Sequence, residues 1–129
     1  MADTLLSRIL IVEDDPDIQK VTSLTLTTLG GFTVHVCGSG REALADAGAF
    51  GPDLILLDVM MPDMDGPRVL RALRDREATA RIPVVFMTAK CQAVDLAEYM
   101  RSGALAVIAK PFDPIRLSDT LRGIWRTRT

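Results

Sequence analysis

Short runs of apolar residues alternate along this chain with longer segments in which apolar residues recur at helical spacing. Five runs predict β-strands: Arg8–Val12, Phe32–Cys37, Leu54–Leu57, Ile82–Met87 and Ala106–Ala109. Runs rich in Leu, Ile and Val that stop abruptly at polar residues are typical of parallel strands buried on both faces. We therefore expect these strands to lie side by side in the interior of a sheet.

The segments between the strands predict helices. They are Ile18–Leu29, Arg41–Ala49, Pro67–Arg76, Ala93–Arg101 and a last helix that begins near Asp113-Pro114 and reaches Trp125. An acidic cap with a following proline starts the first helix, at Asp15-Pro16, and Gly30-Gly31 ends it. Regular alternation of strands and helices with short connections predicts an α/β fold with a doubly wound, five-stranded parallel sheet. We expect one domain over residues 1–129, with its core at about 8–125.

Composition narrows the class of protein. With 48% hydrophobic and 25% charged residues, the chain has the make-up of a soluble globular protein. A net charge of −2 gives no reason to expect direct nucleic-acid binding. We expect a solvated helix face, rather than a basic docking patch, from the C-terminal arginines: Arg116, Arg122, Arg126 and Arg128. The start of the chain has no signal-peptide pattern and no apolar run is long enough to cross a bilayer, so we expect a cytoplasmic location.

The spacing of the cysteines and the histidine does not indicate a metal or redox site. Cys37 and Cys91 are far apart in sequence and lack a metal-ligand spacing, so reduced thiols are expected. A redox role for Cys91 is the weaker alternative. His35 lies within an apolar run and is interpreted as a strand residue rather than a ligand or base.

Polar residues follow four of the five predicted strands. Glu13 and Asp14 follow the first, Asp58 the third, Thr88 the fourth and Lys110 the fifth. Parallel strands share one carboxyl edge, where ligands bind in open α/β sheets, so these groups can converge. Such a set suits phosphoryl transfer: a carboxylate nucleophile, two acids for a hard divalent cation, a hydroxyl donor and a fixed ammonium.

These residues, in this order, resemble the receiver domain of two-component response regulators, the CheY-like family. The resemblance covers about Arg8 to Trp125 and rests on Glu13-Asp14, on Asp58 followed by Met60-Met61-Pro62-Asp63-Met64-Asp65-Gly66, on Thr88-Ala89 and on Lys110-Pro111-Phe112. It implies a flavodoxin-like sheet of strand order 2-1-3-4-5 with five helices. It also implies a phosphoacceptor signalling domain rather than an enzyme that turns over a substrate.

The resemblance further implies a role for each site residue. Asp58 accepts a phosphoryl group from a histidine kinase or a phosphotransfer protein. Mg²⁺ is held by Asp58, by Asp14, by Glu13 directly or through water, and by the backbone carbonyl of Met60. Lys110 pairs with the phosphoryl group, Ala89 contacts it, and Thr88 reorients to bond it. The Lys110-Pro111 bond corresponds to the family's cis peptide, and the output is a downstream protein target or effector domain.

Several positions depart from the family's pattern. Val107 stands where many receivers carry an aromatic switch residue, so we expect output through backbone and helix shifts. Leu105-Ala106 and Arg116 replace acidic positions used in one class of receiver dimers, so that dimer is not expected. The apolar face Ala93-Leu96-Ala97-Met100 is interpreted as core rather than as a partner surface. Met60 and Lys90 occupy positions that tune the acyl-phosphate lifetime, and a bulky Met60 predicts slow self-dephosphorylation.

Other interpretations stay open. Asp15 is expected to cap a helix, and Asp63 and Asp65 to stabilise a turn. One rival function is a receiver-like binding module without phosphotransfer. Another is a Mg²⁺-dependent phosphohydrolase using an aspartyl phosphate, although Met60 replaces the general acid usual in such enzymes. We expect a stand-alone regulator, with a receiver cut from a longer protein as the alternative. The kinase, the output and the oligomeric state have no signal in the sequence.

Overall fold

The computed structural model describes residues 5–128, and within them five parallel strands form one sheet in the order β2-β1-β3-β4-β5. The strands are β1 (Arg8–Val12), β2 (Thr33–Cys37), β3 (Leu54–Asp58), β4 (Val84–Thr88) and β5 (Ala106–Ala109). The helices are α1 (Pro16–Thr28), α2 (Gly40–Phe50), α3 (Gly66–Arg74), α4 (Ala93–Arg101) and α5 (Leu117–Thr127). The predicted fold class and strand order are confirmed.

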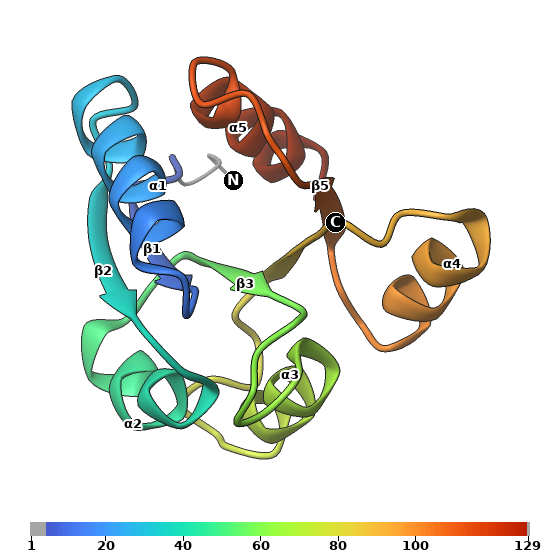
Figure 1. Cartoon of the computed structure of the whole chain (residues 1–129). Helices are drawn as coiled ribbons and strands as arrows, with labels where there is room; N and C mark the ends of the chain where they lie inside the picture. The colour runs from blue at the N-terminus through green and yellow to red at the C-terminus, as the bar shows by residue number, and fades with distance from the viewer. Residues whose placement is uncertain (1–4, 129) are drawn as a thin grey trace.

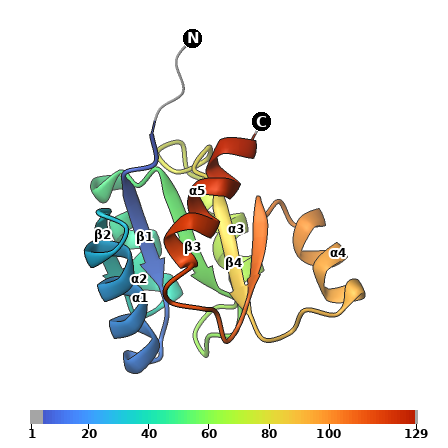
Figure 2. The ribbon, with the colours of Figure 1, turned by 90° about the horizontal axis from the view of Figure 1, so that it is seen from above.

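The helices cover both faces of the sheet (Figures 1 and 2). α1 and α5 lie on one face, where Leu26 and Leu121 pack against Ile11 and Leu56. α2, α3 and α4 lie on the other. The alternating side chains of each strand divide between the two cores, which explains why the central strands are apolar at nearly every position.

Strand register places the polar strand ends together. Asp58 is paired with Met87, the residue before Thr88, and Thr88 is paired with Ala109, the residue before Lys110. The strands that carry these side chains therefore end within one residue of each other at the carboxyl edge of the sheet.

Some predicted boundaries were wrong by a few residues. β4 begins at Val84 rather than at Ile82, since Pro83 has no N–H to donate to the sheet. α5 begins at Leu117, because Asp113 caps a separate turn instead of the helix. Its side chain accepts the N–H of Ile115 at 3.0 Å, and its carbonyl accepts that of Arg116 at 3.1 Å. The remaining helix and strand ends differ from the predicted ends by four residues or fewer.

The interpretation of α4 as a core helix was wrong for most of its apolar face. Ala93 and Ala97 are exposed, Met100 is 49% exposed, and only Leu96 is half-buried. The helix is instead anchored by Tyr99, whose ring packs edge-on against Phe86 with centroids 5.5 Å apart. Helical periodicity indicated that the helix has an apolar face, but not which residue the sheet covers.

The C-terminal arginines are only partly a solvated face. Arg116 and Arg126 are exposed as expected. The guanidinium of Arg122 instead stacks on the Phe32 ring at 4.4 Å, and that of Arg128 on the Trp125 ring at 3.4 Å. These two side chains cover aromatic surface, because the planar guanidinium can stack on a ring while the aliphatic part of the side chain packs along apolar surface. None of the helices within residues 5–128 has the length and apolarity needed to span a membrane.

Candidate functional site

Three carboxylates meet at the carboxyl edge of the sheet. Glu13 and Asp14 follow β1, Asp58 ends β3, and one oxygen of each lies within 4.8 Å of the others. Glu13 and Asp58 are almost fully buried, whereas Asp14 is exposed. Together with Lys110 they line a cavity of about 280 Å³, and the other lining residues are Asp15, Ile18, Met60 and Ala89. The sequence prediction that these acids converge is confirmed.

Lys110 lies between the two buried acids. Its Nζ donates to Glu13 Oε1 at 2.6 Å and lies 3.2 Å from Asp58 Oδ1. Burial alone lowers the pKa of the Lys110 ammonium, but the hydrogen bond to Glu13 and the charge of Asp58 outweigh it and raise this pKa above its ordinary value. The side chain is therefore a fixed positive charge beside the carboxylate of Asp58.

Glu13 is held in place from three directions. Its Oε2 accepts the N–H of Asp15 at 3.1 Å, and its backbone carbonyl accepts the Gln19 side-chain amide at 2.6 Å. Burial raises the pKa of the Glu13 carboxyl to about 6, and the hydrogen bond from Lys110 only partly offsets this. Gln19 was not identified from the sequence, because a polar residue on a solvated helix face has no distinguishing pattern.

Asp58 begins a tight loop between β3 and α3. Its Oδ1 accepts the N–H of Met60 at 3.2 Å, and Gly66 N–H donates to Val59 O at 2.9 Å. A Cβ at position 66 would lie 2.9 Å from Val59 Cα, so the close approach of the two backbones requires glycine there. This loop holds the carboxylate toward the cavity.

Two aspartates in the same loop bind helix N-termini. Asp65 caps α3 by accepting the N–H of Arg68 at 3.0 Å. Asp63 reaches the N-terminus of α2, where its carboxylate accepts the N–H groups of Gly40 at 3.3 Å and Arg41 at 3.1 Å. A slight burial effect on the pKa of Asp63 is outweighed by these donors, which lower it. The prediction of a local turn missed that Asp63 ties the loop to α2. Asp15 caps α1, as predicted.

The loop after β4 forms the other side of the cavity. Thr88 is fully buried and its Oγ1 accepts the N–H of Lys90 at 3.0 Å. The thiol of Cys91 donates to Thr88 O at 3.2 Å. Ala89 is exposed at the cavity, and Lys90 lines a neighbouring groove. A direct contact of Thr88 or Ala89 with a phosphoryl group, and an effect of Lys90 on the lifetime of that group, stay predictions.

Two further expectations concern β5. The Lys110-Pro111 peptide bond is cis, as predicted, and Lys110 N–H donates to Thr88 O at 2.9 Å. Val107 is half-buried and is paired with Phe86 of β4. The position therefore packs against the core that also holds α4.

The donor set fits a hard divalent cation. Carboxylate oxygens are the ligands that Mg²⁺ prefers, and it is usually held by one or two carboxylates with water completing the shell. Here one exposed and two buried carboxylates face a cavity open to water. Two of them already contact the ammonium of Lys110, which shows that this position accommodates positive charge.

Comparison with known proteins identifies relatives of matching architecture. The sequence model of the response regulator receiver domain matches residues 9–122. The chain is 41% identical over 121 residues to the DNA-binding response regulator MtrA of Mycolicibacterium smegmatis, covering 93% of this chain and 51% of that protein. It is 39% identical over 110 residues to the regulatory protein AtoC of Escherichia coli, covering 85% of this chain and 23% of that protein.

A solved structure of the same size is also similar. The chemotaxis response regulator CheY4 of Vibrio cholerae superposes with a TM-score of 0.85 and is 32% identical. The match covers 92% of this chain and 98% of that one. By contrast, the chain spans about half the length of MtrA and less than a quarter of AtoC.

Proposed function

The chain belongs to the response regulator receiver domain family, and from this membership we propose that Asp58 accepts a phosphoryl group from the phosphohistidine of a kinase or phosphotransfer protein. The observation that carries the proposal is the position of Asp58. Its carboxylate is buried at the floor of an acidic cavity and lies 3.2 Å from a lysine ammonium. A partly desolvated carboxylate oriented by a fixed cation is suited to nucleophilic attack.

In the proposed reaction a carboxylate oxygen of Asp58 attacks phosphorus, and an O–P bond forms while the P–N bond of the donor breaks. The electron pair of that bond remains on the imidazole nitrogen. Lys110 Nζ can offset charge on the phosphoryl oxygens as they approach. The backbone N–H of Met60, 3.2 Å from Asp58 Oδ1, helps to hold the attacking group.

We propose that Mg²⁺ is the cofactor. Glu13, Asp14 and Asp58 would hold it with carboxylate oxygens, and Met60 with its backbone carbonyl. When bound, the ion would neutralise negative charge on the attacking carboxylate and on the oxygens of the transferred phosphoryl group. Asp14 is the exposed member of the set, so it would contact a partly hydrated ion at the mouth of the cavity.

We propose that phosphorylation alters contacts with a downstream protein or effector domain. The β4–α4 loop is the route favoured by the contacts. Thr88 Oγ1 binds only one backbone N–H in this loop, that of Lys90, so rotation toward a phosphoryl oxygen would break one hydrogen bond. Val107 has no ring to rotate, and the exposed face of α4 follows directly on the loop.

The proposal is tested by incubating the chain with Mg²⁺ and acetyl phosphate and measuring intact mass. We expect a mass increase of one phosphoryl group per chain, removed by hydroxylamine as an acyl phosphate is, and absent when EDTA is present. No incorporation would favour a binding module without phosphotransfer. Sustained release of phosphate from monoesters would favour the phosphohydrolase instead.

Replacement of Met60 by asparagine is expected to shorten the lifetime of the acyl phosphate about tenfold, a change of about 1.4 kcal/mol in the barrier. Met60 is 58% exposed and lines the cavity, so its apolar side chain hinders an attacking water. The decay of labelled protein is followed after the phosphodonor is removed. Met100→Asn, at a methionine on α4 that is 49% exposed and does not line the cavity, should leave the decay unchanged. Equal decay of wild type and Met60→Asn would contradict the prediction.

A further inference from the structure

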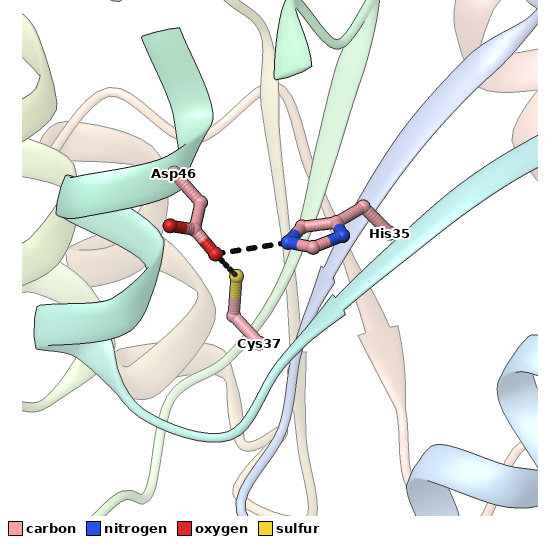
Figure 3. Close-up of side chains that lie close together, drawn as sticks. All are labelled: His35, Cys37 and Asp46. Atoms are coloured by element: carbon pink, nitrogen blue, oxygen red, sulfur yellow. Dashed lines mark hydrogen bonds and ion pairs between the residues drawn. The ribbon is translucent and has the colours of Figure 1, made fainter. Parts of the chain in front are cut away.

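Away from the acidic cavity, three metal-ligating side chains converge between β2 and α2 (Figure 3). His35 and Cys37 are two residues apart on β2 and therefore lie on the same face of the sheet. α2 covers that face and directs Asp46 toward them. Asp46 Oδ2 is 2.9 Å from His35 Nε2 and 3.8 Å from Cys37 Sγ.

We propose that His35, Cys37 and Asp46 form a binding site for Zn²⁺ or a similar borderline-soft divalent ion. Imidazole nitrogen, thiolate sulfur and carboxylate oxygen together form a donor set that Zn²⁺ accepts, with a water as the fourth ligand. The site is separate from the acidic cavity and does not depend on the function proposed for Asp58.

Two of the three separations between the ligand atoms suit this ion. A tetrahedral Zn²⁺ bound at about 2.0–2.3 Å requires roughly 3.4 Å between nitrogen and oxygen ligands and roughly 3.6 Å between sulfur and oxygen ligands. The observed separations are 2.9 Å and 3.8 Å, and the three atoms lie within 4.8 Å of one another. Shifts of about half an ångström or less in these two separations would therefore meet the required values.

The surroundings orient the His35 ring and leave an approach for the ion. The His35 ring packs on Phe50, with centroids 5.4 Å apart, and the Phe50 carbonyl is itself held by Arg8. Cys37 is fully buried, whereas the side chains of His35 and Asp46 are 41% and 39% exposed. An ion can thus enter from solvent and keep one water.

Binding would exchange protons for the ion. In the structure Asp46 accepts a hydrogen bond from the Cys37 thiol and pairs with His35. Burial and the nearby charges of Glu42 and Asp46 raise the pKa of the thiol to about 12, so it is protonated in the absence of an ion. Coordination forms the S–metal bond and releases the thiol proton to water. The metal would then link the edge strand β2 to α2.

Cobalt(II) tests the site, because a thiolate ligand gives a near-ultraviolet charge-transfer band that a site made only of carboxylates lacks. We expect the full chain to show this band, and Cys91→Ser, which removes the other thiol, to keep it. Cys37→Ala should lose it. His35→Gln and Asp46→Asn, both at half-exposed positions, should weaken cobalt binding about a hundredfold, since even indirect partners of a metal contribute 10- to 100-fold.

Circular dichroism of each variant shows whether the fold is retained, and competition by Zn²⁺ should abolish the cobalt band. The absence of a band in the wild type would overturn the proposal. So would a band that depends on Cys91 rather than Cys37. Unchanged affinity in His35→Gln and Asp46→Asn would leave only a hydrogen-bonded cluster, which also overturns it.

Discussion

Alanine at position 58 is expected to abolish phosphoryl incorporation from acetyl phosphate. In the proposed reaction Asp58 supplies the attacking oxygen, and the two neighbouring acids hold other positions in the cavity. Glu13 is bound to Lys110 at 2.6 Å and to the N–H of Asp15, while Asp14 is exposed at the cavity mouth. Loss of a nucleophile reduces the rate of group transfer by at least about a thousandfold. Intact mass measured over time would detect the loss.

The matched control is Asp75→Ala, which removes an exposed carboxylate at the end of α3, at the opposite edge of the sheet. That variant should incorporate one phosphoryl group at the wild-type rate. Both variants should bind no more of a dye that reports exposed apolar surface than the wild type does, and both should unfold cooperatively. The difference in labelling then reports chemistry rather than loss of the fold. Labelling of Asp58→Ala at the wild-type rate would place the phosphoacceptor elsewhere.

Replacement of Phe86 by alanine is expected to lower the free energy of unfolding by about 3–5 kcal/mol. Phe86 is fully buried in the interior strand β4, and its ring contacts Tyr99, the anchor of α4. The substitution leaves a cavity and removes an edge-to-face pair worth about 0.5–1.5 kcal/mol of that total. Against a usual stability of about 5–15 kcal/mol this is a large fraction, and urea denaturation measures it.

Val94→Ala is the control for Phe86→Ala, since Val94 is 66% exposed on the same helix that Phe86 supports. It should change the free energy of unfolding by no more than about 0.5 kcal/mol. Amide exchange provides a second measurement. In Phe86→Ala the amides of α4 should exchange faster than those of α1, because only α4 depends on the Phe86–Tyr99 contact. A loss below about 1 kcal/mol would contradict the role of this ring.

The fold could be predicted from the sequence because its strands are buried on both faces. Continuous apolar runs ending at Glu13, Asp58 and Lys110 indicated both the parallel sheet and the edge at which the charges meet. The convergence of these residues followed from topology alone. The structure adds that Lys110 bridges two of the acids. That contact depends on the reach of the side chains and not on their positions in the chain.

Contacts between elements distant in sequence were harder to predict. Asp63 is more than twenty residues from the backbone donors Gly40 and Arg41 that it binds, and a carboxylate in a turn-forming loop gives no indication of a partner so far away. The same holds for Asp46 and His35, since residue spacing along one segment cannot reveal a side chain on a neighbouring helix that contacts it. For α4, an apolar face is visible in the sequence, but its exposure depends on its packing at the edge of the sheet.

The carboxylate of Asp63 gives the two sides of the cavity different stiffness. The β3–α3 loop is fastened to α2 by two backbone N–H groups, whereas the β4–α4 loop is joined to Thr88 mainly by contacts within itself. Movement of the first loop requires α2 to move or its N-terminal donors to be exposed to water. Movement of the second disturbs only its own short hydrogen bonds. The β4–α4 loop is therefore the easier of the two loops to displace from the cavity, and α4 follows directly on it.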